Sequence, residues 1–185
     1  MAKIGLKYPV FGVLTEAVGG NTYSAMKEIA KAIKADIKLQ KSDAKLYAND
    51  GIAESDNSVT GGTVSLEIDD LSDEVYTALM GHAKVSETAE IVAKGGDTSP
   101  YVGFGFYGAK MVNNVRKYRA IFIPKVKFAE PDDSNATKGE NTSFQTQTIE
   151  GTIVLLDDGT WKFEQTFDTE AEAKAYLAGK FKKVE

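Results

Sequence analysis

Three glycines near the middle of the chain, Gly103, Gly105 and Gly108, form the pattern G-x-G-x-x-G, which in many enzymes holds the phosphates of a dinucleotide. Such a loop follows a strand and opens a helix, because the backbone must turn sharply around the phosphates. Here Phe104 and Phe106 stand between the glycines, which places the pattern inside a strand. We therefore predict a strand with an aromatic face in the core and a bare glycine face where another element packs closely.

Other residue types that do chemistry are sparse. His82 is the only histidine and the chain has no cysteine, which leaves no two-histidine metal site and no thiolate ligand. Because the sequence shows no partner for His82, a polar surface residue is predicted, with a lone general base as the alternative. Aspartate favours turns, and the acid pairs stand at predicted turns: Asp69-Asp70, Asp132-Asp133 and Asp157-Asp158. We expect no catalytic residue, no cofactor and no metal, and therefore no enzyme.

The length and the net charge of the chain limit which classes of protein it can belong to. The 185 residues suffice for one domain with a real core, and residues 1–185 are treated as a single domain. The net charge of −5 argues against a DNA clamp but suits a surface that DNA passes without sticking. The N-terminus has no apolar signal region, and no apolar run approaches the ~20 residues of a membrane span. We expect folding in a cytoplasm and no membrane partner.

The glycine strand is one half of a predicted β-hairpin. Its two strands, Tyr101–Tyr107 and Tyr118–Phe128, flank an asparagine-bearing turn. In the first strand Val102 joins the two phenylalanines on the core side, and in the second Pro124 marks a bulge or an edge position. A basic cluster on this pair is expected to meet acidic neighbours: Arg116, Lys117, Arg119, Lys125 and Lys127.

Apolar periodicity and cap residues predict the other elements. Residues 24–40 fit a helix and a strand equally well. Trp161, Phe163 and Phe167 are predicted to share one strand face. An arm or edge strand is predicted at 1–23, with further strands at 63–69, 143–155 and 160–167 and loops at 46–62 and 130–141. One helix is predicted to be capped by Ser72 and ended by Gly81. A C-terminal helix is predicted at 169–178, opening with the Thr169/Glu172 capping box and ending at Gly179. This set predicts a mainly β fold with flanking helices, a β-sandwich or partial barrel.

Several stretches in this order and spacing resemble the major tail protein family, the tail tube subunits of long-tailed, non-contractile bacteriophages. They are Lys45–Asp56, Thr63–Gly81 with its D-D-L-S-D-E-V-Y segment, Pro100–Gly108, Lys117–Ala120 and Ile149–Ile153. The resemblance runs over about residues 1 to 180 and rests on the order of these stretches, since no single motif is diagnostic.

The resemblance implies a structural protein of the virion tail, made in the cytoplasm of the host bacterium. Its subunits would form hexameric rings that stack into a tube, with antiparallel strands joining a ring-wide β-barrel around a channel that conducts phage DNA. The implied partners are further copies of the chain, a tape measure protein inside the tube, and the tail terminator and distal tail proteins at its ends. Double-stranded DNA would pass without specific binding.

The same resemblance favours a strand at residues 32–40 and gives the polar segments a role. Polar strand faces are expected to line the channel through Asp36, Glu67, Asp69 and Glu150. The two loops are expected to contact the next ring through Leu46, Tyr47, Asn49, Asp50, Ile52, Asp132, Asp133 and Lys138.

Two alternatives remain open at this point. One is the tube subunit of a phage-tail-like bacteriocin, which carries no DNA. The other is a monomeric β-sandwich module that binds a ligand such as a carbohydrate, with exposed aromatic residues such as Trp161 along its groove.

Overall fold

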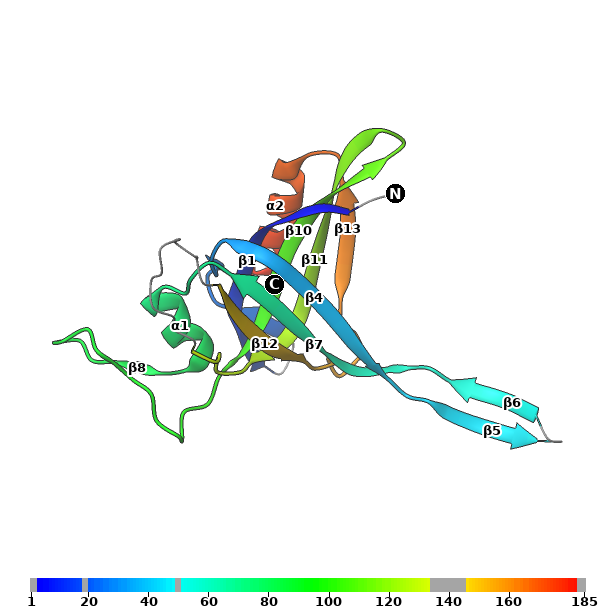
Figure 1. Ribbon diagram of the computed structural model, residues 1–185, viewed down its shortest axis with the longest axis horizontal. Coiled ribbons are helices and arrows are strands. Elements are labelled where there is room, and N and C mark those ends of the chain that lie inside the picture. Colours follow the sequence, from blue (N-terminus) through cyan, green and yellow to red (C-terminus); the bar gives the residue numbers. More distant parts are fainter. Residues whose placement is uncertain (1–2, 18–19, 49–50, 134–145, 183–185) are drawn as a thin grey trace, which may run out of the picture.

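The chain is mainly β with two flanking helices, as predicted (Figure 1). The computed structural model describes residues 3–17, 20–48, 51–133 and 146–182. Within them the strands are β1 (Lys3–Ala17), β2 (Gly20–Tyr23), β3 (Lys27–Glu28), β4 (Ala32–Lys41), β5 (Ala44–Ala48), β6 (Gly51–Asp56), β7 (Val59–Ile68), β8 (Ala83–Lys84), β9 (Ile91–Val92), β10 (Tyr101–Val112), β11 (Val115–Phe128), β12 (Gln147–Ile153) and β13 (Phe163–Phe167). The helices are α1 (Asp73–Met80) and α2 (Glu170–Lys180). Residues 32–40, which the pattern left undecided, therefore lie in a strand.

The main sheet has the order β2-β1-β10-β11-β12-β7-β4, and all its pairings between described strands are antiparallel. Its strand β11 is shared: residues 118–122 pair with β13, and residues 126–128 pair with β12. The sheet curls far enough for β4 to approach β1 (Figure 1). This curl makes the fold a partial barrel.

The β10–β11 hairpin is longer than predicted but has the predicted turn. Asn113 and Asn114 both have positive φ, 50° and 62°, the backbone of a tight hairpin turn. Val102 lies opposite Val126 whereas Phe104 lies opposite Ile123, so β11 carries an extra residue at Pro124, the predicted bulge.

That bulge changes which side chains of β11 face the main core. Before it the odd-numbered Ile123 is buried in this core, and after it the even-numbered Val126 and Phe128 are buried there. Because side chains alternate along a strand, one extra residue is needed to keep both apolar groups on the same side.

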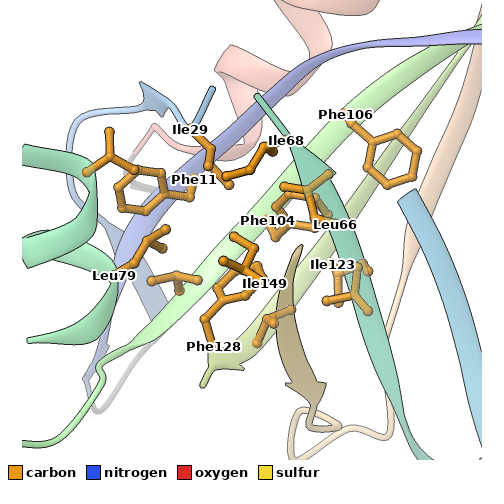
Figure 2. Packing of buried hydrophobic residues seen from close by; sticks show 14 of the residues in the cluster. Phe11, Ile29, Leu66, Ile68, Leu79, Phe104, Phe106, Ile123, Phe128 and Ile149 are labelled. Carbon is orange, nitrogen blue, oxygen red and sulfur yellow. The ribbon is translucent and has the colours of Figure 1, made fainter. Parts of the chain in front are cut away.

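The main core lies between the face of β10–β11 and the strands that curl over it, with α1 closing one end (Figure 2). Val64, Leu66 and Ile68 of β7 are each 0% exposed, as the alternation of this strand predicted. Val102 and Phe104 lie in the same cluster. Burial of each such side chain contributes ~1.5–3 kcal/mol relative to leaving it in water.

A second, smaller core lies on the opposite face of β10, under α2. A Cβ placed on Gly103 would lie 2.6 Å from Cε1 of Tyr23, and one on Gly105 would lie 2.9 Å from Cδ2 of Leu177 in α2. The bare glycine face is therefore the packing surface for β2 and α2, which confirms the predicted close approach of another element.

Both helices begin as predicted, but one of them ends later. Gly81 ends α1 with a φ of 76°, although the Ser72 side chain makes no capping bond. The reciprocal bonds of Thr169 and Glu172 form the predicted capping box of α2. The helix continues through Gly179, however, because Phe181 at its C-cap is buried in the second core, at 5% exposure.

Three strand predictions need correction. The predicted strand 160–167 begins only at Phe163, and Trp161 before it packs on the main core while Phe163 and Phe167 pack on the second, so the three do not share a face. Strand β12 ends at Ile153 rather than at residue 155, and the next residue, Val154, donates its N–H to the Lys125 carbonyl across the bulge. Of the two forms predicted for residues 1–23, an arm or an edge strand, the arm is wrong: the described residues form the strands β1, paired with β10, and β2, paired with β1.

Candidate functional site

A continuous polar face covers the outer side of the three strands β12, β7 and β4. Residues directly opposite in antiparallel strands share one face, and the register aligns three rows across the sheet: Thr148–Glu67–Lys34, Glu150–Ser65–Asp36 and Thr152–Thr63–Lys38. The residues between these positions, such as Ile149 and Leu66, point into the main core. The same alternation that builds the core therefore leaves a surface without an apolar side chain in these rows.

Three of the four residues predicted to line a channel lie on this face. Asp36, Glu67 and Glu150 occupy the first two rows. Asp69 follows the end of β7 instead, and its Oδ1 accepts hydrogen bonds from the backbone N–H groups of Lys31 at 3.0 Å and Asp70 at 2.9 Å. Its carboxylate therefore joins the end of β7 to the backbone that leads into β4.

The charges on the polar face are mixed and slightly acidic. Its three carboxylates face two lysines, and the Lys34 ammonium lies 2.5 Å from Asp36. The hydrogen bond to Asp36 raises the pKa of Lys34, so this lysine stays charged. Thr146 donates to Oε1 of Glu67 at 2.9 Å. Such a surface is wetted and carries no cluster of cations to bind phosphates.

The segment predicted as a loop at 46–62 is a β-ribbon. Strands β5 and β6 pair with each other, with Tyr47 opposite Ile52, and form an arm that projects away from the body (Figure 1). The Ser42 N–H donates to the Ser58 carbonyl at 2.8 Å, so the arm continues the β4–β7 ladder. Leu46 lies in β5, and Asn49 and Asp50 lie outside the described residues. A two-stranded ribbon without a third strand is marginally stable in water, so a further contact would stabilise this arm.

The second set of predicted contact residues lies at the other end of the molecule. Asp132 and Asp133 follow Glu130, whose carboxylate accepts a short hydrogen bond from the Tyr76 hydroxyl of α1. Helix α1 and the arm stand at opposite ends of the long axis (Figure 1). Lys138 lies outside the described residues. The two predicted contact segments are thus not brought together but separated along the subunit.

His82 is not the surface residue that was predicted. Its side chain is only 6% exposed and lies between Asp97 and Glu130. Neither carboxylate is near it in sequence, so no local signal reveals the contact. Three of the five residues in the predicted basic cluster meet acidic neighbours: Lys117 pairs with Asp168, Arg119 with Glu164 and Lys125 with Glu16. Lys127 lies over the Tyr101 ring instead.

The described residues contain no group of three or more His, Cys, Asp or Glu side chains placed to hold a metal ion. None of their helices combines the length and apolar character needed to cross a membrane. Comparison of the chain with protein-family models and with curated proteins finds no match.

Proposed function

We propose that this protein is the tube subunit of a long-tailed bacteriophage, the major tail protein, which assembles into stacked hexameric rings around a channel for DNA. The observation that carries the proposal is the polar face of β12, β7 and β4, continued directly into the projecting β5–β6 arm. In the assembled tail the polar face lines the channel, and the sheet edges are completed by neighbouring subunits into a ring-wide barrel.

The separation of the two contact segments supports stacking. A filament needs two different surfaces that meet head to tail, since a self-complementary patch closes into a dimer instead. The arm stands at one end of the subunit and the Glu130–Asp133 segment at the other (Figure 1). The arm of one ring would therefore reach the next ring, and the mixed, slightly acidic channel wall would let duplex DNA pass.

Electron microscopy of the purified protein, with and without removal of the arm, tests the assembly. The variant replaces residues 44–56 by a short glycine-containing turn, which the Ser42–Ser58 hydrogen bond allows to close without moving β4 or β7. We expect rings and tubes from the intact chain and unstacked subunits or single rings from the variant, with the thermal midpoint of the body retained. Absence of rings and tubes from the intact chain at high concentration, with tail initiator complex supplied, would contradict the proposal.

Cysteine labelling tests which face lines the channel, because the natural chain has no cysteine. Glu150→Cys places a thiol on the polar face, and Glu87→Cys places a matched control in the exposed connection between β8 and β9. In assembled tubes we expect Glu150→Cys to react with a small maleimide but not with a polymer-linked maleimide. The control should react with both. If the two variants react equally with the polymer-linked maleimide, the polar face does not line the channel.

The alternative of a ligand-binding β-sandwich finds less support. Trp161, the aromatic residue expected in an open groove, is half-buried against the main core, with the Lys162 ammonium 4.8 Å from its ring. A strictly monomeric chain in size-exclusion chromatography, together with binding in a carbohydrate screen, would favour that alternative. A phage-tail-like bacteriocin tube uses the same subunit surfaces, and the neighbouring genes separate it from a phage tail.

A further inference from the structure

His82 contacts a carboxylate through each of its two ring nitrogens. Nδ1 lies 2.8 Å from Oδ2 of Asp97, and Nε2 lies 2.9 Å from Oε2 of Glu130. A neutral imidazole carries one N–H and can donate only one hydrogen bond, whereas the imidazolium carries two. Since ionised carboxylates can only accept, both contacts are hydrogen bonds only when His82 is protonated.

We propose that His82 is a protonation-dependent latch that ties the segment entering the 130–141 loop to α1 and to the turn after β9. The three tied parts are distant in sequence: Tyr76 is in α1, Asp97 lies beyond β9, and Glu130 follows β11. Within the described residues the latch supplies a polar tether between them, in addition to the packing of α1 on the main core.

The groups around the ring decide which contact opens. Asp97 is held a second time, because its Oδ2 also accepts the backbone N–H of Lys94 at 2.9 Å. The Glu130 side chain is 52% exposed, and its other oxygen accepts from the Tyr76 hydroxyl. Loss of the ring proton therefore leaves the Asp97 contact in place and releases Oε2 of Glu130 to water, so that Glu130 keeps only its bond from the Tyr76 hydroxyl. Among the described residues, two further charged groups act on this cluster: the Lys94 ammonium on Asp97, and Asp133 on Tyr76.

The charges around His82 favour the protonated form of its ring, which is the form that the latch requires. The hydrogen bond to Asp97 raises the pKa of His82, the bond to Glu130 adds to the rise, and burial of the ring opposes it. A raised pKa in the folded chain means that the latch contributes fully to stability below the ordinary histidine pKa of 6.5. That contribution is lost as the pH rises through the raised value.

Titration of the ring by NMR tests the latch directly, since the chain has a single histidine and one imidazole signal to follow. The measurement uses the dilute, unassembled full chain, so its result does not depend on the proposed tube. We expect a titration midpoint above 6.5 and two slowly exchanging ring N–H signals below it, one of which is lost above it. A midpoint at or below 6.5, or a single protected ring N–H at low pH, would overturn the proposal.

Matched variants assign the two contacts. Asp97→Asn and Glu130→Gln remove one charge each while keeping an acceptor oxygen, and both should lower the midpoint relative to the natural chain. Glu87→Gln, an equal charge change at an exposed site, should leave it unchanged. A midpoint that responds equally to all three would show a general charge effect and refute the specific contacts.

Hydrogen exchange reports the mechanical consequence. After correction for intrinsic rates, the amides of residues 129–133 should lose protection as the pH crosses the midpoint, and His82→Gln should show no such step. If the amide protection of this segment does not change across the His82 titration midpoint, other contacts hold the segment and the proposal of a latch is refuted. If the proposed tube is correct, this step also predicts that inter-ring contact made by the 130–141 loop weakens above the midpoint, a consequence that rests on the proposed function.

Discussion

Replacement of Gly103 by alanine should destabilise the fold although it adds only a methyl group. The new Cβ would lie 2.6 Å and 2.9 Å from two ring carbons of Tyr23 and 3.0 Å from Cζ of Phe122. The Tyr23 ring cannot swing away freely, because its hydroxyl donates to the Pro124 carbonyl at 3.0 Å and its faces meet Phe122 and Phe181 edge-on. Such overpacking costs ~1–3 kcal/mol.

The net effect includes an opposing contribution. Alanine reduces the entropy of the unfolded chain relative to glycine, which stabilises the fold by ~0.4–1 kcal/mol. Because two rigid rings oppose the methyl group, we take the upper end of the overpacking range, about 3 kcal/mol. Less the opposing contribution of up to about 1 kcal/mol, the expected net loss for Gly103→Ala is about 2 kcal/mol. At ~2–4 °C per kcal/mol for a chain of this size, the thermal midpoint should fall by about 4–8 °C.

Two matched substitutions make the expectation sharp. Gly105→Ala meets only the flexible end of Leu177, at 2.9 Å, so its cost should be smaller. Gly95→Ala has no atom within 4 Å of the new Cβ and should be neutral or slightly stabilising. Urea unfolding at low protein concentration measures the three free energies of unfolding. If Gly103→Ala proves as stable as Gly95→Ala, the glycine strand is not a packing surface of this kind.

Three further substitutions test other parts of the fold. Leu177→Ala should cost ~2–5 kcal/mol in urea unfolding, because the side chain is 0% exposed. Combined with Gly105→Ala the two costs should be less than additive, because Leu177→Ala removes the Cδ2 atom that crowds the new Cβ. Thr169→Ala should cost ~0.5–2 kcal/mol in thermal melts followed by circular dichroism, because it removes one bond of the capping box; a cost equal to that of an exposed Thr→Ala change elsewhere would exclude the cap. The hydrogen bond to Arg119, with a second from Lys162, lowers the pKa of Glu164 to about 2, so its pairing stabilises the chain above the ordinary glutamate pKa of 4.5 and is lost as the pH falls towards 2. Arg119→Met should therefore raise the Glu164 pKa in a carboxyl NMR titration, and an unchanged pKa would exclude Arg119 as the main cause.

The β10–β11 hairpin could be predicted because its information is local. The aromatic side chains of the strand, the asparagine turn and Pro124 each act on the backbone within a few residues, and the structure places all three as predicted. The burial of Val64, Leu66 and Ile68 could also be predicted, since apolar and polar residues alternate strictly along a strand with one face in a core.

The β5–β6 arm was missed for the opposite reason. A ribbon that leaves the body has no face in the core, so its sequence shows no alternation to identify it as a strand and its serine, aspartate and glycine residues predict a loop. The contact of His82 was missed because its partners lie 15 and 48 residues away, which only the tertiary fold can bring together. Trp161 was misplaced because residues 160–162 precede the strand, where alternation no longer fixes direction.

The continuity of the arm with β4 and β7 has a mechanical consequence. The hydrogen bonds of an antiparallel ladder run perpendicular to its strands. A pull on the arm along its length draws β4 and β7 in the same direction, so it loads in shear the pairing of β7 with β12. The rungs then share the load and must fail together, whereas a pull across the strands would open them one at a time. An arm built in this way transmits tension into the strands that carry the polar face, through the chain on either side of the Ser42–Ser58 hydrogen bond.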